Sequence, residues 1–459
     1  MFACLRCLKF LKNPYLVKGI VFLAMRVTIV TCVALVVMCL SSCTRSYRKV
    51  EFNYDSDVLC LGVDRTVYPA ENADGEIPDS AWDGFRFQQE FYLVNPENGA
   101  SLSDASFAYV SDFHDGVAVA RDNSGACFFI DKSGRRIIDA LYKDATLFSD
   151  GRAWVRSFDD EIIAVDRKGN KVFYAPEAVM VNTFYDGKSV IYTQDGHTKV
   201  VDTSGKELFD GKGHGGNFVV DGRIVMPGAD GQGVMSLDGD FILAPVYKSV
   251  GQLQWVDVGS YVDALCDDRF IVLKDSGYGV VDKTGKEIVP AMFEDIVRDG
   301  EMFLAQSRGA GSSVGSKAIW YNRDGRVEIE GTFTEAYPFG DGDFAAACDS
   351  RHWGFIDKKG NWAIKPEWTF VGTSMDANGR AVVYDNDSAE AGLLRADGTM
   401  AVEYGYSVIS PLKGTGLYAI SKGQKTGIMD MNGEIVVPAD KYDFSGVINE
   451  DKHLYIYID

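Results

Sequence analysis

A turn centred on glycine recurs nine times along this chain. Its strongest copies read Asp-x-x-Gly directly after an apolar run, as in Ile356-Asp-Lys-Lys-Gly360, and three weaker copies lack the leading aspartate. Successive glycines lie 34 to 46 residues apart. A period of this length is typical of repeat architectures, in which each unit packs on its neighbours. The nine glycines are Gly134, Gly169, Gly205, Gly239, Gly285, Gly325, Gly360, Gly398 and Gly433.

A second landmark keeps the same period. An Asp-Gly pair follows an aromatic residue at five places, and it precedes the glycine of the first landmark by 17 or 18 residues. These five glycines are Gly116, Gly151, Gly187, Gly222 and Gly342. Because aspartate caps turns and glycine accepts a positive φ, each unit is expected to hold two turns about half a period apart.

The runs between the turns have the composition of β-strands. They are short and rich in β-branched residues, as in Glu161-Ile-Ile-Ala-Val-Asp166, and no continuous helical periodicity occurs after residue 100. The sequence therefore predicts an all-β fold, a tandem array of β-hairpin units. Nine units are clear, and a degenerate tenth would end at Gly99, which lies 35 residues before Gly134.

The arrangement of the units stays open at this point. A propeller-like ring and a curved solenoid both fit the pattern, and nine units exceed the usual four to eight blades of a closed propeller. The longest step, between Gly239 and Gly285, predicts a possible seam near residues 240–270. Two consecutive subarrays of five units are the alternative to one array.

Several units resemble a known bacterial repeat. Trp353-Gly354-Phe-Ile-Asp357-Lys-Lys-Gly360, followed by a strand with Pro366, is similar to the WG repeat (KWG) family, whose pattern is Trp-Gly-Phe-Ile-Asp-x-x-Gly. The resemblance extends to Tyr278-Gly279-Val-Val-Asp282-Lys-Thr-Gly285 and runs from about residue 100 to the last residue. The tryptophan of the pattern occurs only at Trp353, so several units are degenerate and their strand pairing stays open.

The N-terminus has the layout of a secretory signal. The first 42 residues carry five Lys or Arg and no acid, with an apolar run at 27–40. Leu40-Ser-Ser-Cys43 resembles a bacterial lipobox, which implies a lipid on Cys43. The apolar run is short for a membrane span, although an uncleaved anchor over 19–42 is the competing interpretation. Residues 1–24 look like an extra leader, because a complete signal already starts at Met25, so the true start is either Met1 or Met25.

These features predict three segments. Residues 1–42 are a signal peptide, 43–84 a lipid-anchored tether with an N-terminal strand, and 85–459 the repeat array. The predicted location is the cell envelope, attached to the membrane through the lipid, with the outer membrane favoured by Thr44 after the cysteine.

The net charge and the cysteine spacing exclude some classes of partner and ligand. Asp and Glu number 66 against 46 Lys and Arg, so the chain repels nucleic acid phosphates, and no nucleic acid partner is expected. Outside the leader, Cys60, Cys127, Cys266 and Cys348 lack metal-ligand spacing. We expect buried thiols, and disulfides are the alternative in an oxidising compartment.

Catalytic machinery is not visible in the sequence. The five histidines have no partner at triad or metal-ligand spacing, and nucleophile-elbow, phosphate-loop and dinucleotide motifs are missing. Acid pairs such as Asp385-Asn-Asp387 are explained by turn capping rather than by calcium, since the EF-hand spacing is absent. No catalytic residue, metal or cofactor is therefore predicted.

Tryptophan supplies the remaining candidates. Trp320 and Trp353 lie inside strand runs and are expected in the core, whereas Trp255, Trp362 and Trp368 are candidates for an exposed binding surface. Repeat arrays offer broad surfaces, which favours a protein or glycan ligand. The predicted function is an envelope binding or scaffold module. An envelope hydrolase with a site at the centre of the array and a purely structural envelope protein are the alternatives.

Overall fold

The computed structural model describes residues 54–64, 89–251, 265, 267–307, 316–412, 414–423, 425–438 and 455–457, all within the unit Arg48–Asp459. The leader, Cys43, Trp255 and Cys266 lie outside the described residues. Within these ranges, no helix is long and apolar enough to cross a membrane.

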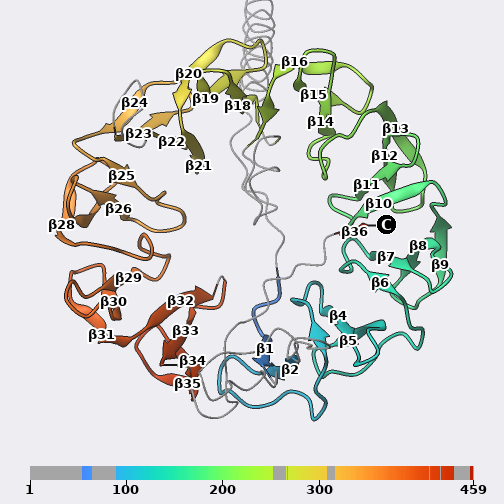
Figure 1. Cartoon of the computed structure of the whole chain (residues 1–459), viewed down its shortest axis with the longest axis horizontal. Helices are drawn as coiled ribbons and strands as arrows, with labels where there is room; N and C mark the ends of the chain where they lie inside the picture. Colours follow the sequence, from blue (N-terminus) through green and yellow to red (C-terminus); the bar gives the residue numbers. More distant parts are fainter. Residues whose placement is uncertain are drawn as a thin grey trace, which may run out of the picture. The chain divides into compact units, whose positions relative to one another are not determined.

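The described residues form ten small antiparallel sheets that follow one another along the chain (Figure 1). The first holds β1 (Leu59–Asp64) and β2 (Gln89–Val94), the second β3 (Tyr109–Val110), β4 (Val117–Arg121) and β5 (Cys127–Asp131), and the third β6 (Asp144–Ala145), β7 (Arg152–Arg156), β8 (Ile162–Asp166) and β9 (Lys171–Tyr174). The fourth holds β10 (Ala178–Asn182), β11 (Lys188–Thr193), β12 (His197–Asp202) and β13 (Glu207–Lys212), and the fifth β14 (Arg223–Pro227), β15 (Gln232–Ser236) and β16 (Phe241–Tyr247).

The second half of the chain repeats this pattern. The sixth sheet holds β17 (Ser249–Val250), β18 (Arg269–Lys274), β19 (Gly277–Asp282) and β20 (Glu287–Phe293), and the seventh β21 (Asp295–Asp299), β22 (Met302–Ser307), β23 (Lys317–Asn322) and β24 (Val327–Glu330). The eighth holds β25 (Glu335–Ala336), β26 (Ala345–Cys348), β27 (Trp353–Ile356) and β28 (Trp362–Trp368), the ninth β29 (Arg380–Tyr384), β30 (Ala391–Arg395) and β31 (Met400–Tyr406), and the tenth β32 (Val408–Leu412), β33 (Leu417–Lys422), β34 (Lys425–Asp430) and β35 (Ile435–Val437).

Each sheet is a meander, because its strands pair in chain order. One further strand, β36 (Tyr455–Tyr457), returns from the end of the chain and pairs with β10, which gives the fourth sheet five strands. The prediction of an all-β array of nine to ten hairpin units is confirmed. The degenerate tenth unit is the first sheet, whose turn places Gly99 at a φ of 65°.

The Asp-x-x-Gly turn joins the third and fourth strands of a unit. In the eighth sheet, the Asp357 carboxylate accepts the backbone N–H groups of Lys359 at 2.8 Å and Asn361 at 2.9 Å. Gly360 has a φ of 81°, and the pairing between β27 and β28 shifts at this point. Glycine removes the steric cost of that φ, and the capped aspartate fixes the turn, so the motif sets the register.

The Asp-Gly turn joins the first and second strands. Asp115, Asp150, Asp186 and Asp221 have φ values of 50° to 53°, and the glycine after each one also has a positive φ. Two successive positive φ values are those of a type I′ hairpin, whose twist matches that of the strands.

Gly342 departs from the expected Asp-Gly turn. Its φ is not positive, and Gly340, with a φ of 59°, takes the left-handed place. A Cβ on Gly342 would lie 1.9 Å from the carbonyl oxygen of Met375 in the chain before β29. Close approach of the backbone, rather than turn geometry, therefore requires glycine there.

The core is divided into ten clusters, and each cluster fills the space between two neighbouring sheets. Neighbouring residues on a strand pack against opposite sheets: Ala153 packs towards the second sheet and Trp154 towards the fourth. One cluster joins Leu59 and Leu61 of the first sheet to Leu417 and Ile428 of the tenth. The succession of contacts thus closes on itself, which is the packing order of a propeller rather than that of an open solenoid.

No break in the core accompanies the long step near residues 240–270. Val234 and Tyr247 of the fifth sheet share one cluster with Val250 and Phe270 of the sixth. The extra length lies in the connection between β17 and β18.

Candidate functional site

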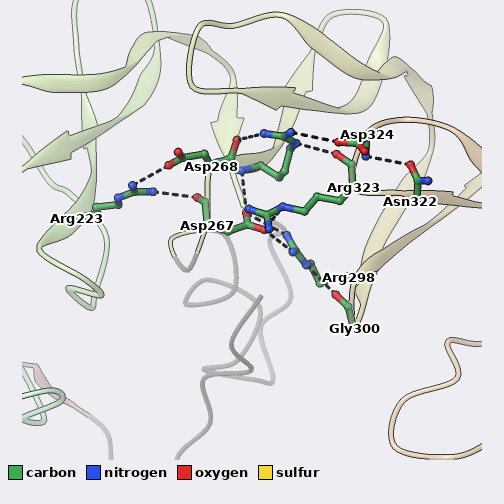
Figure 2. Close-up of polar contacts among 9 residues, drawn as sticks. Arg223, Asp267, Asp268, Arg298, Gly300, Asn322, Arg323 and Asp324 are labelled. Carbon is green, nitrogen blue, oxygen red and sulfur yellow. Dashed lines mark hydrogen bonds and ion pairs between the residues drawn. The ribbon is translucent and has the colours of Figure 1, made fainter. Parts of the chain in front are cut away.

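A cluster of arginine and aspartate side chains lies where the connection from β17 enters β18 (Figure 2). We call Arg223, Asp267, Asp268, Arg269, Arg298 and Arg323 the Arg–Asp cluster. At its centre, the carboxylate of Asp267 is fully buried and the Arg298 side chain is 4% exposed. The Arg298 Nη2 lies 2.5 Å from the Asp267 Oδ2 and its Nη1 3.3 Å from Oδ1, a two-pronged ion pair.

The cluster ties three consecutive sheets together. From the fifth sheet, Arg223 donates to the Asp267 carbonyl at 2.9 Å and to the Asp268 carboxylate at 2.7 Å. Arg269 of the sixth sheet donates its Nε to the Arg323 carbonyl in the seventh at 2.7 Å. The position at which the long connection enters β18 is therefore fixed from both sides.

The chemistry of the cluster suits positioning. The Asp267 Oδ1 accepts the Arg269 backbone N–H at 2.8 Å in addition to Arg298, while Oδ2 lies 3.5 Å from the Arg323 Nε. A guanidinium stays charged at every physiological pH, and both carboxylate oxygens are engaged. Removing one partner of such a buried pair costs about 3–5 kcal/mol, because the other charge loses its compensation.

One contact of the cluster recurs elsewhere in the frame. Arg152 begins β7, and Arg380 begins β29, as Arg269 begins β18. Each donates its Nε to a carbonyl in the Asp-x-x-Gly turn of the next sheet. The acceptors are Thr203 at 2.9 Å and Met431 at 3.0 Å. Sequence reasoning missed this contact, although arginine after a first-strand turn was a visible signal.

A separate cavity of about 290 Å³ lies between the first and second sheets. Its lining includes Glu90 of β2, Arg121 of β4, Phe128 of β5 and Arg136 beyond the following turn. The Arg136 guanidinium carbon lies 4.2 Å from the centre of the Phe128 ring, and Arg121 pairs with Asp144 at 2.9 Å. No local sequence pattern indicates this cavity, because its walls come from four separate segments.

The predicted exposure of Trp368 is wrong. Its side chain is buried at 4% exposure, its Nε1 donates to the Tyr404 hydroxyl at 2.9 Å, and its ring packs on Phe355. Trp362 is half-buried and packs edge-on against Phe333 at 5.3 Å. In β28, exposed Ala363, Lys365 and Glu367 alternate with less exposed residues. Trp362 packs towards the seventh sheet and Trp368 towards the ninth. Trp255 lies outside the described residues.

Exposed aromatic residues that were not predicted include Phe158 and Phe370. Phe158, in the turn between β7 and β8, is 63% exposed, and Phe370, after β28, is 49% exposed. The Phe370 ring lies 5.0 Å from the ring of Tyr384. Phe158 stands between Ser157 and Asp159 in a turn, a polar context that indicates exposure better than ring size does.

The repeat-signature residues maintain the frame. Trp353 is buried, and a Cβ on Gly354 would lie 2.7 Å from the Ile364 carbonyl oxygen in β28. Likewise, a Cβ on Gly279, next to half-buried Tyr278, would lie 2.8 Å from the Ala291 Cα.

The second signature repeats the same turn. Asp282 caps the Thr284 N–H at 2.8 Å, and Gly285 has a φ of 81°. The signature residues therefore lie where the third and fourth strands of a unit pack closely.

Cys60, Cys127 and Cys348 are buried free thiols. Burial raises the pKa of Cys127 to about 11 and raises that of Cys60 as well, so both stay protonated at neutral pH. Among the residues that the structure describes, no three His, Cys, Asp or Glu side chains gather as metal ligands.

Comparison with known proteins identifies the repeat. Residues 128–159, 278–299, 320–349 and 353–387 match the family "WG containing repeat". Each matched segment begins on the third strand of one sheet and ends beyond the start of the next, so a sequence repeat spans two sheets. No curated protein sequence matches the chain.

Solved structures similar to the chain have low identity. The computationally designed Ika8 protein shares 12% identity and covers 71% of this chain and 93% of its own, with a TM-score of 0.33. BamB from Moraxella catarrhalis shares 17% identity, with coverages of 64% and 92% and a TM-score of 0.32. A eukaryotic initiation factor shares 9% identity, with coverages of 67% and 92% and a TM-score of 0.41.

The matched segments contain the turn glycines Gly134, Gly285, Gly325 and Gly360 of the second, sixth, seventh and eighth sheets, and each of these glycines has a positive φ. Four segments of the chain thus match the WG-containing repeat, within a closed succession of ten sheets.

Proposed function

We propose that this chain is a lipid-anchored binding or scaffold module of the cell envelope, which recognises a protein or glycan partner. The observation that carries the proposal is the Arg–Asp cluster, which fixes one end of the long connection between β17 and β18. Recognition residues commonly lie on connections that a rigid scaffold positions.

The polar side chains described above are engaged in contacts within the frame, and this supports binding over catalysis. The Asp267 carboxylate is held by arginine, and turn aspartates such as Asp357 cap backbone N–H groups. These groups stabilise the frame, which leaves recognition to the connections and to exposed rings such as Phe158.

The lipid anchor rests on Leu40-Ser-Ser-Cys43. We expect Cys43→Ser to move the protein from the detergent-extracted membrane fraction to the soluble fraction and to abolish incorporation of a labelled fatty acid. Cys60→Ser, at a buried thiol within the frame, is the matched control and should leave both unchanged. Fatty acid incorporation into the Cys43→Ser protein would contradict the anchor.

Capture from detergent-solubilised envelopes tests recognition. We expect a single stoichiometric partner, and we expect Trp255→Ala to weaken its capture more than the matched Trp362→Ala does, because Trp362 packs within the frame. No partner, together with hydrolytic activity in a substrate screen, would favour the hydrolase alternative. No partner and no activity would favour a structural role.

A further inference from the structure

The cavity between the first and second sheets is distinct from the Arg–Asp cluster and from the tryptophans. Its walls come from β2, the chain before β3, the turn between β4 and β5, and the turn after β5. At about 290 Å³, it is close to the lower limit of small-ligand sites. At roughly 30 Å³ for each water-sized group, it holds about ten non-hydrogen atoms.

Two guanidinium groups face this space. Arg136 is exposed, its flat face lies over Phe128, and it makes no ion pair within the described ranges. Arg121 uses its Nη2 to bind Asp144, and its side chain is 36% exposed. The positive charge of Arg121 therefore adds to that of Arg136 at the cavity.

The acids at the cavity have partners inside the protein. Glu90 accepts the Tyr92 hydroxyl at 2.6 Å. Asp122 accepts the N–H of Ser124 at 2.9 Å and its hydroxyl at 2.5 Å, and these bonds keep the pKa of Asp122 low. Both carboxylates remain close enough to oppose a doubly charged guest. The lining thus favours a group with one negative charge.

We propose that this cavity binds a carboxylate, with Arg136 as its main ligand and the Arg121 guanidinium as a second positive charge. Arginine and carboxylate match in shape, since two N–H groups of the planar fork meet two oxygens. The rings of Phe107 and Phe128 offer an apolar wall to whatever carries the carboxylate. Two sources share this chemistry: a free small carboxylic acid and the C-terminus of a peptide. The inference does not rest on the proposed envelope function.

Binding to the purified full-length chain in detergent tests the inference by calorimetry. The probes are acetate, N-acetyl-Ala-Ala and its C-terminal amide. We expect N-acetyl-Ala-Ala to bind at least about tenfold more tightly than the amide, because the amide loses a charge-assisted hydrogen bond. Acetate binding as tightly as the peptide identifies small acids as the source, and weaker acetate binding identifies peptide C-termini. Equal binding of peptide and amide, or no binding of either carboxylate, overturns the proposal.

Two neighbouring arginines provide a matched pair of variants. Arg136→Gln should weaken N-acetyl-Ala-Ala binding about tenfold or more. Arg135→Gln should leave it unchanged, because the Arg135 side chain is 81% exposed and pairs with Asp131 in its own turn. Inorganic phosphate should bind more weakly than acetate. Equal losses in the two variants, or tighter binding of phosphate, would also overturn the proposal.

Discussion

Asp299 shows how one residue joins two sheets. Its buried carboxylate, at the end of β21, accepts the Trp320 Nε1–H at 2.8 Å and the backbone N–H groups of Phe339 at 2.9 Å and Gly340 at 3.0 Å. Burial nevertheless raises the pKa of Asp299. Packing of the seventh and eighth sheets removes these three N–H donors from solvent. The Asp299 carboxylate supplies the acceptor that water would otherwise provide.

Asp299→Asn tests this junction. The amide presents an NH₂ group to N–H donors, so at least one of the three is left without an acceptor, and we expect a loss of about 1–3 kcal/mol in the free energy of unfolding. Asp150→Asn is the control, because Asp150 caps the Gly187 N–H at 2.8 Å from an exposed turn. Thermal melts of both variants should show a larger loss of stability for Asp299→Asn than for Asp150→Asn. Equal losses of stability would contradict the role given to the burial of Asp299.

The turn aspartates give the protein a defined response to acid. Hydrogen bonds from Asn170, Ser204 and Asn361 lower the pKa values of Asp166, Asp202 and Asp357 respectively. A carboxyl whose pKa is lower in the folded state binds protons more readily when unfolded. Its contribution to stability is therefore present above about pH 4 and is lost as the pH falls through the folded pKa.

We expect the melting temperature to fall between about pH 5 and pH 3, and the triple variant Asp166→Asn, Asp202→Asn, Asp357→Asn to fall less steeply. Asparagine keeps the turn acceptor but does not titrate. Glu367→Gln with Glu403→Gln, at exposed acids on β28 and β31, is the control that should retain the original slope. An unchanged slope in the triple variant would refute the assignment.

At the scale of the strand and turn, two kinds of glycine hold the unit together. Gly398 has a φ of 85° and open space where a Cβ would stand, whereas Gly354 is required because β28 crosses it closely. The need for the first kind of glycine is local, and the neighbouring aspartate in the sequence predicts it. The second depends on a strand ten residues away, and only the repeat pattern indicates it.

Substitutions separate the two kinds. Gly398→Ala should cost roughly 1–2 kcal/mol through its left-handed backbone, and Gly398→Asn should recover part of this loss, since asparagine tolerates that conformation. Gly354→Ala should cost about 1–3 kcal/mol through overpacking, and Gly354→Asn should cost more. Urea unfolding of the four variants measures these differences, and a recovery by asparagine at both positions would contradict the distinction.

The sequence predicted most of what is local in each element. The turns at Asp357 and Gly360 and the strands beside them follow from neighbouring residues, and so does the burial of Trp320 and Trp353. Trp368 was misplaced because closeness to a turn was weighed above the alternation with Lys365 and Glu367. The Arg–Asp cluster could not be predicted, since it joins residues 31 to 56 positions apart that meet only when the sheets pack.

Over the whole described molecule, the packing of the first sheet on the tenth is the contact with the largest sequence separation. Leu61 and Val94 meet Ile428 and Val437 in one cluster. Stability in an open array is a sum over neighbouring units, so its ends fray, whereas a closed succession has no end sheet.

Leu61→Ala tests closure. We expect a loss of about 2–5 kcal/mol and faster amide hydrogen exchange in both β1 and β33, because the cavity lies between the first and tenth sheets. Leu243→Ala, at an equally buried leucine between the fifth and sixth sheets, is the control and should loosen β15 and β18 instead. Exchange confined to the first sheet in Leu61→Ala would indicate an open array.

The contact between the first and tenth sheets also determines when the protein becomes complete during its synthesis. Chains emerge from the ribosome N-terminus first, and local units fold as they appear. The side of the first sheet that carries Leu59 and Leu61 keeps apolar surface uncovered until the strands at 408–437 have been made and delivered. A premature stop near the end of the message would therefore damage the beginning of the protein, and a chaperone that holds the chain in transit should be needed longest by its earliest segment.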